Sequence, residues 1–298
     1  MDRRHPIVNF DSKRFSDFFG DLTPNLDARL LSGGACNSNY VVHTSKRDRF
    51  VCRIHNRGNP LVEKTITELL GDDVPAPEYL WVGEGVSVIS FLEGAHFSPT
   101  RELMREAGRI IGSLKSISFE QKGQILANGE VVPFEGWDSF EMGLLRLLNA
   151  SHVLDYLDSN SIEALKRIIQ RNRKLLDSFD CFHNLVHGDF RPDNILVSGD
   201  SITGILDWEF AHSGCSYMDI GNLLRHVPSE WEQDLSLGLL EAGFELPPDW
   251  RFRSLLIDLA SHLEFLTSNR ADNFKRECVS RIEALIKLGA EQDIVPNP

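Results

Sequence analysis

Cysteine is scarce in this chain, and the few cysteines follow no pattern typical of a cross-linked or zinc-binding protein. There are five, never in a C-x-x-C pair, so we expect neither a disulfide framework nor a zinc site. We expect buried, reduced thiols instead. The five are Cys36, Cys52, Cys181, Cys215 and Cys278.

Long apolar runs are also missing. No stretch approaches the roughly 20 apolar residues that a membrane helix needs. The N-terminal segment, MDRRHPIVNFDSKRF, contains no apolar signal core. We therefore expect a cytoplasmic protein with no membrane partner, either monomeric or dimeric. The 298 residues, 42% of them hydrophobic, are enough for one large domain or two lobes.

Positive charge is in short supply. The formal net charge is −13, which argues against nucleic acid as a partner. The deficit is concentrated in residues 181–298, where 9 Lys or Arg stand against 19 Asp or Glu. An acidic C-terminal part would attract a cationic substrate. On charge alone, a solvated surface is the better explanation. Ten of these acids, including Asp258 and Glu264, lie between residues 230 and 277, and we expect most of the ten to be plain helix surface.

The first 93 residues have the pattern of a small β-rich lobe. Two hairpins are predicted, around residues 45–48 and 83–85, because short apolar runs flank each polar or glycine-rich turn. Between them, residues 61–70 are predicted to form a short helix that ends at Gly71. Glu93-Gly94 breaks the pattern, so we place the boundary between an N-lobe (1–93) and a C-lobe (94–298) there.

The C-lobe is predicted to be mainly helical. Ser98 and Pro99 look like the cap and first-turn proline of a helix that runs to about Ile117. Residues 119–136 look like an irregular connection. Further helices are predicted at about 138–157, 161–178, 217–226, 229–242, 250–268 and 272–288. Two apolar runs flank Ser198-Gly199-Asp200 and predict a small hairpin among these helices. The fold class is therefore α+β.

This hairpin carries the most informative motif, HGDFRPDNILV (187–197) followed by ILDWE (205–209). Phosphoryl transfer needs an acceptor hydroxyl held in line and magnesium across the phosphates. Asp189, in a loop before a strand, can orient the hydroxyl and accept its proton. Asn194 and Asp207 offer magnesium the hard oxygen ligands it prefers. The hairpin between them would bring both ligands to the same edge.

The pattern H-G-D-x-x-x-x-N, three apolar residues, then apolar-D-W-E resembles the catalytic loop and metal motif of the aminoglycoside phosphotransferase and choline kinase-like family. Residue types, both spacings and the intervening hairpin agree. Residues 51–54 (VCRI) resemble the family's third strand, 74–77 (VPAP) its V-P-x-P turn and 89–94 its hinge. The resemblance implies a two-lobed protein-kinase-like fold, with a small β-rich N-lobe and a larger, mainly helical C-lobe.

The resemblance also implies roles for single residues. Asp189 resembles the catalytic base, and Asn194 and Asp207 the magnesium ligands. Arg53 occupies the position of the phosphate-binding lysine, and Glu63 that of its ion-pair partner. Backbone amides of a small-residue loop would cover the phosphates, and backbone groups of the hinge would hold the adenine ring. The loop residues are Gly33, Gly34 and Ser38, and the hinge residues are Ser90, Phe91, Leu92 and Glu93.

Three further residues near the motif are expected to be structural. Asp219 resembles the family's acid that supports the catalytic loop. We expect His187 to be a loop histidine rather than an acid–base group, and Trp208 to pack the motif. No A-P-E-like segment follows Asp207, and only 12 positions separate it from Asp219. A protein kinase needs a longer segment there to bind its peptide, so we expect a small acceptor.

The chain also departs from the family pattern. Arg53 stands in place of lysine; because arginine is always charged and grips phosphate bidentately, the function is retained but its geometry differs. Lys115 stands where the family often has histidine, and Arg191 and Asp193 replace the usual His and Gly of the loop. For Arg191, contact with the γ-phosphate is one interpretation and solvent exposure the preferred one; Asp193 is expected at the surface. These changes leave the chemistry intact and put the substrate in doubt.

The predicted function is ATP- and Mg²⁺-dependent O-phosphorylation of a small hydroxylated molecule, with GTP as the other nucleotide to consider. An aminoglycoside-type antibiotic, which is cationic, is the first acceptor considered. The alternatives are a kinase of choline, homoserine or a sugar, and a nucleotide-binding pseudokinase scaffold. A metal-dependent hydrolase using His187, Asp189 and Asp207 is a further possibility, weakened because Asn194 would be idle.

Overall fold

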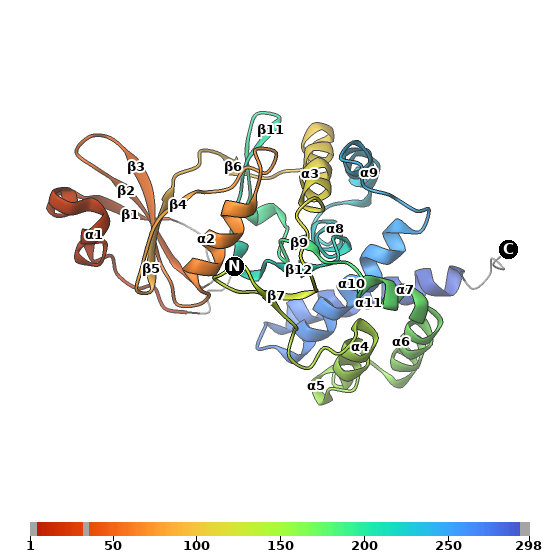
Figure 1. Ribbon diagram of the computed structural model, residues 1–298. Coiled ribbons are helices and arrows are strands. Elements are labelled where there is room, and N and C mark those ends of the chain that lie inside the picture. Colours follow the sequence, from red (N-terminus) through yellow and green to blue (C-terminus); the bar gives the residue numbers. More distant parts are fainter. Residues whose placement is uncertain (1–4, 32–35, 293–298) are drawn as a thin grey trace.

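A computed structural model describes residues 5–31 and 36–292 as two lobes, a sheet-based one and a larger helical one (Figure 1). The α+β class and the kinase-like arrangement of the lobes are as the sequence predicts. Among the described helices, none is both long and apolar enough to cross a membrane.

A five-stranded antiparallel sheet forms the centre of the N-lobe, in the order β1-β2-β3-β5-β4. Cys52 and Val88 face each other across β3 and β5 and are fully buried. Gly85 has a φ of 63° in the β4–β5 turn, a left-handed conformation that glycine adopts at no steric cost. Both predicted hairpins are confirmed. The strands are β1 (Asp27–Leu30), β2 (Ser38–His43), β3 (Arg49–Ile54), β4 (Tyr79–Gly83) and β5 (Val86–Ser90).

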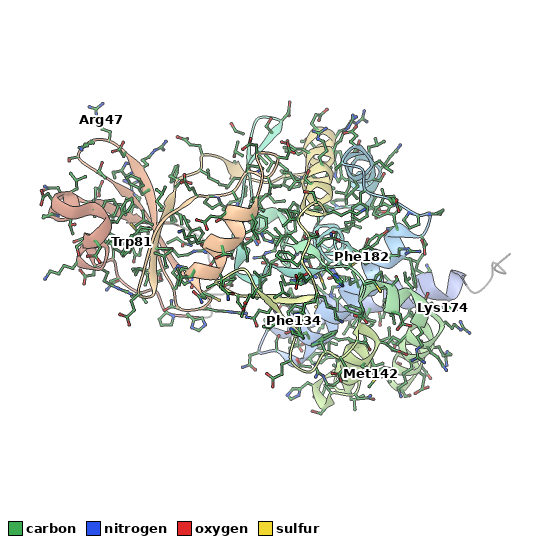
Figure 2. All side chains as sticks on the ribbon, in the orientation of Figure 1. Arg47, Trp81, Phe134, Met142, Lys174 and Phe182 are labelled. Carbon is green, nitrogen blue, oxygen red and sulfur yellow. The ribbon has the colours of Figure 1, made fainter. Side chains whose placement is uncertain are left out.

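The segment before the sheet is helical, which the sequence pattern did not predict. It forms η1 (Ser12–Phe15), α1 (Ser16–Phe19) and η2 (Gly20–Asn25). The Asp11 carboxylate accepts a hydrogen bond from the Lys13 amide and caps the first turn. Phe15 and Phe19 are buried against the sheet, and the ring centroids of Phe15 and Trp81 lie 6.5 Å apart. Trp81 is labelled on the N-lobe sheet in Figure 2. Aromatic packing therefore stabilises a segment too short to show a helical period.

One helix, α2 (Pro60–Leu69), contacts both the N-lobe strand β4 and η4 (Trp208–Phe210) of the C-lobe. Asn59 caps it by accepting a hydrogen bond from the Leu61 amide, and Pro60 occupies its first turn. The predicted helix is thus confirmed. It carries Glu63, only 2% exposed, into the space between the lobes.

Beyond Ser90 the chain enters the C-lobe, where β6 (Ala95–His96) pairs with β10 (Ile195–Ser198). β10 pairs in turn with β11 (Ser201–Ile205), so the predicted small hairpin is confirmed. Ile195 lies opposite Ile205 in this register. Residues immediately outside the hairpin, Asn194 on one side and Leu206 on the other, are therefore neighbours. The exact lobe boundary at residue 93 stays a prediction.

A second C-lobe sheet has the order β8-β7-β12-β9. It consists of β7 (Gly123–Ile125), β8 (Val131–Val132), β9 (Asn184–Val186) and β12 (His212–Gly214). Two of these strands lie in residues 119–136, so the prediction of an irregular connection there was wrong. β8 pairs with β7, and β7 pairs with β12, nearly 90 residues further along the chain, so this sheet could not be read from local sequence. β9 leads directly into the HGD motif.

Helices make up most of the C-lobe (Figure 1). The expected helices at 138–157 and 161–178 are each divided in two. The expected cap at Ser98 was also wrong, because Thr100 caps the helix by accepting from the Leu103 amide. The helices are α3 (Arg101–Leu114), α4 (Phe140–Leu148), α5 (Ser151–Leu154), α6 (Ser159–Arg171), α7 (Arg173–Phe179), α8 (Tyr217–Leu224), α9 (Glu232–Glu241), α10 (Trp250–Thr267) and α11 (Asp272–Gln292).

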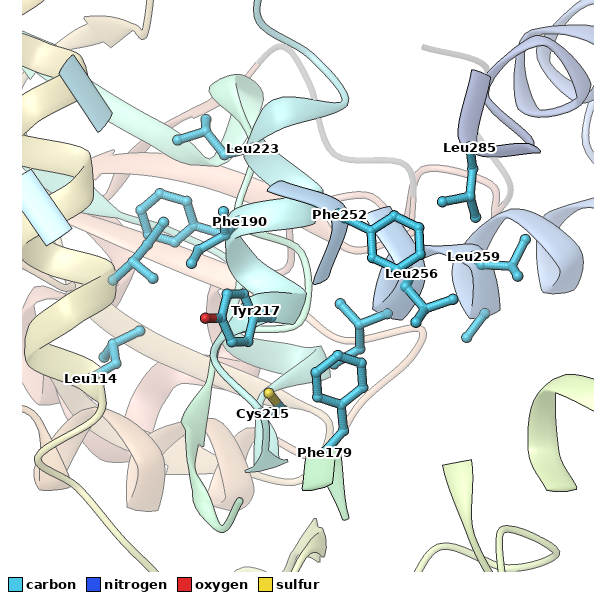
Figure 3. Packing of buried hydrophobic residues seen from close by; sticks show 14 of the residues in the cluster. Leu114, Phe179, Phe190, Cys215, Tyr217, Leu223, Phe252, Leu256, Leu259 and Leu285 are labelled. Carbon is cyan, nitrogen blue, oxygen red and sulfur yellow. The ribbon is translucent and has the colours of Figure 1, made fainter. Parts of the chain in front are cut away.

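The C-lobe core lies between these helices (Figure 3). Tyr217 packs there between Phe179 and Phe244, with ring centroids 6.1 and 5.6 Å away. Cys215 is buried beside it. Cys181 is exposed, so the expectation of buried thiols was wrong at that position.

Candidate active site

A cleft of about 830 Å³ lies between the lobes. Its walls come from strands β3 and β5, the segment after β5, the loop after β9, the D-W-E motif and the end of α10. Most of the site residues expected from sequence meet in this cleft. They are Arg53, Glu63, Ser90, Phe91, Leu92, Asp189, Asn194 and Asp207.

Four expected residues are not found in its wall. Ser38 is fully buried, and its hydroxyl accepts a hydrogen bond from the Val8 amide at 3.0 Å. Glu93 is exposed and forms an ion pair with Arg49 at the edge of β3. Gly33 and Gly34 lie outside the described residues.

The loop after β9 is held in place through His187, which is fully buried. Its Nε2 is 3.0 Å from the Leu206 carbonyl, which can only accept, and its Nδ1 accepts from the Asp189 amide at 3.2 Å. The ring is therefore neutral and protonated at Nε2, and burial lowers its pKa. Because both nitrogens are used, His187 is a structural residue, and the hydrolase with His187 as a metal ligand is wrong.

Asp219 supports the same loop from α8. Its two carboxylate oxygens accept hydrogen bonds from the amides of His187 and Gly188, both at 2.8 Å. Burial raises the pKa of Asp219, and the two hydrogen bonds, which favour the ionised form, lower it. Burial is the larger effect, so the pKa is raised to about 7. The supporting role that the sequence implies is thus present in the geometry.

Asp189 emerges from this loop with its carboxylate held on two sides. Asn194 Nδ2 donates to Asp189 Oδ2 at 3.0 Å and to its carbonyl at 2.9 Å. Arg191 Nε lies 3.2 Å from the same Oδ2. The side chain of Arg191 is only 20% exposed, so the expectation of an exposed arginine was wrong. Asp193 is exposed as expected, with 63% of its side chain accessible.

Asn194 and Asp207 meet where the hairpin closes, because the Leu206 amide donates to the Asn194 carbonyl at 2.8 Å. Both hydrogen bonds that the Asn194 side chain makes with described residues are donated by Nδ2, so Oδ1 is available as a ligand. An amide oxygen next to a carboxylate suits Mg²⁺, which takes few protein ligands and completes its shell with phosphate oxygens and water. No cluster of three or more His, Cys, Asp or Glu suited to a metal occurs among the described residues.

Asp207 has a left-handed backbone, with φ 69° and ψ 62°. Such a conformation is uncommon for a residue other than glycine and costs of order 1 kcal/mol or more. The bend directs its carboxylate into the cleft, whereas Trp208 turns inward. Trp208 is 1% exposed and its Nε1 donates to the Ile205 carbonyl, so it packs the motif as expected.

Arg53 joins three elements at this point. Its Nε donates to Asn39 Oδ1 at 3.0 Å, Nη1 to Glu63 Oε2 at 2.7 Å and Nη2 to Asp207 Oδ1 at 3.0 Å. Burial alone would lower the pKa of Arg53, but Glu63 and then Asp207 outweigh it and raise the pKa. Tyr79 donates to the same Glu63 oxygen at 2.8 Å. Arg53 therefore pairs with Glu63, as the family resemblance implies, whereas Glu68 on the same helix pairs with Lys64.

Glu209 also lines the cleft, and the sequence prediction missed it. Its Oε2 is buried without a hydrogen-bond partner in the described part of the chain. Burial first, and the charge of Asp207 second, raise the pKa of Glu209 to about 7. Its place in the D-W-E motif was a signal that could have identified it.

The part of the cleft wall that α10 and the residues after it supply carries both charges. Glu264 and Arg270 lie there near the end of α10, together with the hydroxyls of Ser261 and Ser268. Arg270 is stacked on Phe265, with its guanidinium carbon 4.3 Å from the ring centroid. This part of the wall is therefore balanced in charge rather than acidic. Glu264 is one of the ten acids of which most were expected to be helix surface; it is exposed and lines the cleft.

Comparison with known proteins defines the class. A model of the phosphotransferase enzyme family (APH) matches residues 27–256, which include the HGD loop and the D-W-E motif. The match covers more than half of the chain, and the chain belongs to this family.

Similar curated sequences are homoserine kinases. The enzyme of Zymomonas mobilis subsp. mobilis is 25% identical over 227 residues, which are 66% of this chain and 63% of that protein. That of Rhodopseudomonas palustris (strain BisB18) is 24% identical over 281 residues, 85% of this chain and 79% of that protein. The chain thus spans less than two thirds of the length of the Zymomonas relative.

Similar solved structures are antibiotic phosphotransferases. Aminoglycoside phosphotransferase APH(4)-Ia superposes with a TM-score of 0.70 at 15% identity, over 93% of this chain and 99% of that one. A macrolide 2'-phosphotransferase from Brachybacterium faecium superposes with a TM-score of 0.67 at 16% identity, over 97% of this chain and 99% of that one. At this level of identity the likeness establishes the kinase-like fold.

Proposed function

We propose that this protein is a small-molecule kinase that transfers the γ-phosphoryl group of ATP to a hydroxyl, with Mg²⁺. The observation that carries the proposal is the meeting of Asp189, Asn194 and Asp207 at one point of the cleft, next to Arg53. Family membership and the homoserine kinase relatives support the same reaction class.

In this proposal Asp189 acts on the acceptor. Its carboxylate, fixed by Asn194 and Arg191, accepts a hydrogen bond from the substrate hydroxyl, aims the oxygen at the phosphorus and takes the proton as the new bond forms. Arg191 also places a positive charge beside the group being transferred. Positioning of this kind accounts for most of the rate enhancement in phosphoryl transfer.

The nucleotide would be held between the lobes. Arg53 offers its guanidinium to the phosphates, and Asn194 Oδ1 and the Asp207 carboxylate would hold Mg²⁺, which neutralises phosphate charge when bound. The adenine ring would lie against the apolar wall and the backbone of residues 90–93. The apolar wall includes Val51, Ile89, Leu196 and Leu206. A related structure, a mutant of APH(4)-Ia, holds AMP-PNP, which supports ATP as the first nucleotide to test, with GTP as the comparison.

The acceptor end of the cleft favours a zwitterion over a polycation. Glu264 can pair with an ammonium group and Arg270 with a carboxylate, whereas an aminoglycoside needs several acids without a competing cation. A hydroxy amino acid such as homoserine is therefore the first acceptor to test. The aminoglycoside remains the second, supported by the fold and by the overall net charge of −13.

A coupled ADP-release assay with Mg²⁺ and ATP tests the proposal against homoserine, choline, aminoglycosides and sugars. Asp189→Asn is expected to reduce acceptor-dependent turnover by a factor of at least about 100 while nucleotide binding is retained. Asp200→Asn, at the exposed turn of the neighbouring hairpin and outside the cleft lining, is the matched control and is expected to keep most of the activity.

The scaffold alternative makes the opposite prediction. A nucleotide-binding pseudokinase would bind Mg²⁺–ATP in calorimetry but show no acceptor-dependent ADP release with any compound, and Asp189→Asn would change nothing. Equal background turnover of the wild type and Asp189→Asn would therefore contradict the kinase. An acceptor-dependent signal that disappears in the variant would identify both the reaction and its substrate class.

A further inference from the structure

A second cavity, of about 580 Å³, lies in the C-lobe and shares no lining residue with the cleft. It is bounded by the end of α3, the start of β9, the segment leading into α8, and the loop between α9 and α10. The residues around it are Lys115, Phe182, Asn184, Cys215, Ser216, Tyr217, Phe244, Glu245, Leu246, Pro247 and Arg253.

Two hydroxyl groups that line this cavity, of which that of Ser216 is buried, lack hydrogen-bond partners within residues 5–31 and 36–292. Ser216 is 4% exposed and its Oγ has no partner. Tyr217 is also 4% exposed, and its hydroxyl makes no hydrogen bond to a described residue. In Figure 3 this hydroxyl points to the side on which Leu114 lies, immediately before Lys115. Burial raises the pKa of Tyr217 to about 12, so it remains a donor at neutral pH.

Unpaired buried hydroxyls are unfavourable, because each loses its hydrogen bonds to water without replacement. The buried, unpaired hydroxyl of Ser216, with the unpaired hydroxyl of Tyr217 in the same cavity lining, points to a ligand with acceptor atoms. Lys115 adds a cation: its Nζ lies 5.4 Å from the centroid of Phe244 and makes no ion pair with any described residue. The guanidinium of Arg253 is also present, although Asp249 pairs with it at 2.8 Å.

The rest of the lining is apolar and aromatic, with Phe182, Phe244, Leu246 and Pro247. Such walls suit a hydrocarbon or aromatic body, whereas a strongly hydrated inorganic anion would gain nothing from them. The acid on the rim, Glu245, further disfavours a multiply charged anion.

We propose that this cavity binds a small organic carboxylate with an apolar body, held by the ammonium of Lys115 and the hydroxyls of Ser216 and Tyr217. The apolar body packs against Phe182 and Phe244. The binding site stands independently of the kinase activity proposed above, because none of its residues lines the cleft.

The position of the cavity connects it to the catalytic loop. Asn184 begins β9, which leads into His187 and Gly188, and Ser216 and Tyr217 lead into Asp219. Asp219 in turn accepts hydrogen bonds from the amides of those two loop residues at 2.8 Å. A carboxylate bound in the cavity therefore contacts both segments that hold the catalytic loop and stabilises them. A bound carboxylate would thereby act as an effector of the activity. That role, unlike binding, rests on the proposed function.

Binding is tested by calorimetry with benzoate and with benzamide, which has the same ring but no charge. Benzoate is expected to bind at least about tenfold more tightly, since charge-assisted hydrogen bonds are the stronger ones. Ser216→Ala, Tyr217→Phe and Lys115→Met should each weaken benzoate binding severalfold. Lys174→Met is the matched control: this lysine is exposed on α7 (Figure 2), and its removal should leave the affinity unchanged.

Three results would overturn the proposal. Equal affinity for benzoate and benzamide would exclude carboxylate recognition. Full affinity in the Lys115 and Tyr217 variants, or loss of benzoate binding when Mg²⁺–ATP is saturating, would place the benzoate elsewhere. Inorganic phosphate binding as tightly as benzoate would make the site a general anion site. Thermal melts of Ser216→Ala and Tyr217→Phe, both of which preserve packing, verify that the variants are folded.

The coupling is tested by hydrogen exchange as well as by kinetics. Benzoate should slow exchange of the His187 and Gly188 amides severalfold, and unchanged exchange would contradict the coupling. If the protein binds benzoate and protects these amides but transfers no phosphate to any acceptor, the proposed kinase function fails while the site stands. If turnover is found but benzoate binds weakly and no more tightly than benzamide, the proposed kinase function stands and the carboxylate site fails.

Discussion

Arg53 Nη2 lies 3.0 Å from Asp207 Oδ1, so the guanidinium at the expected phosphate-binding position is paired with the carboxylate expected to hold magnesium. The same side chain also binds Glu63 and Asn39. The planar guanidinium presents separate donors in fixed directions, whereas a lysine ammonium is a single point charge. Arginine therefore connects β3, α2 and the D-W-E motif, which are far apart in the sequence.

Removing this connection should destabilise the protein. Arg53→Met leaves Glu63, which is 2% exposed, without its ion-pair partner, and the expected loss in the free energy of unfolding is about 3–5 kcal/mol. Arg53→Lys keeps the charge but loses part of the hydrogen bonding, with an expected loss of about 1–3 kcal/mol. Urea unfolding followed by circular dichroism measures both.

Arg49→Met is the control for this experiment. Arg49 lies on the same strand and pairs with Glu93, but 41% of its side chain and 70% of that of Glu93 are exposed. Exposed pairs contribute little, at most about 1 kcal/mol. If Arg53→Met costs no more than Arg49→Met, the three contacts of Arg53 do not hold the two lobes together.

Asp219→Asn should loosen the catalytic loop. Both carboxylate oxygens accept from backbone amides, and an asparagine has one oxygen and one NH₂ group, so either the His187 or the Gly188 amide loses its acceptor. A buried donor without a partner costs about 1–3 kcal/mol. Hydrogen exchange of these two amides should accelerate and turnover should fall. Asp200→Asn, at an exposed turn, should change neither; equal exchange in both variants would contradict the supporting role.

The meeting of Asp189, Asn194 and Asp207 could be predicted because it depends on local features. Apolar runs on either side of Ser198-Gly199-Asp200 define a hairpin, and a hairpin necessarily brings its two ends together. The role of Trp208 followed from the same motif, whereas that of Asp219 was implied by the family resemblance. Helix α2 was predictable for a similar reason, since its cap, its first-turn proline and its end are all marked in the sequence.

Environments created by distant residues could not be predicted in this way. Arg191 was expected to be exposed because nothing in the sequence places it against Asp189. The helical segment 12–25 depends on rings from the sheet, and the strands in 119–136 depend on β12. Asp258 was expected on the surface but is buried, because Arg225 and His262 surround it. In each case a tertiary contact overrides the local pattern.

Glu209→Gln should stabilise the nucleotide-free protein. The buried Oε2 of Glu209 has no hydrogen-bond partner among the described residues. Burial and the negative charge of Asp207 outweigh the attraction of Arg57 and raise the pKa of Glu209 to about 7, so its ionised form is unfavourable. An isosteric neutral amide removes this repulsion, with an expected gain of about 1 kcal/mol in the free energy of unfolding at pH 8. Thermal unfolding measures it. Glu230→Gln, fully on the surface, should have no effect, and a loss of stability in Glu209→Gln would show that the carboxylate has a partner.

Asp258 should make stability dependent on acid pH. Burial alone would raise its pKa, but the charges of Arg225 and then His262 outweigh burial and hold the pKa well below its ordinary value. Because the folded pKa lies below the unfolded value of about 3.9, the contribution of this carboxylate is complete at neutral pH. It is lost as the pH falls below that value, where the unfolded chain binds the proton first.

Asp258→Asn tests this dependence directly. At pH 7 the variant leaves Arg225, whose side chain is 4% exposed, without its buried ion-pair partner. The expected loss in the free energy of unfolding is about 3–5 kcal/mol. The difference in the free energy of unfolding between variant and wild type should shrink as the pH is lowered from 5 to 3. Over this range Asp258 of the unfolded wild-type chain becomes protonated, and the stabilisation by its folded carboxylate is progressively lost. Asp272→Asn is the control, since Asp272 pairs with Arg276 at the surface and should show a much smaller difference at every pH. A difference for Asp258→Asn that stays constant between pH 7 and pH 3 would mean that the stabilisation comes from packing and not from the charge of this carboxylate.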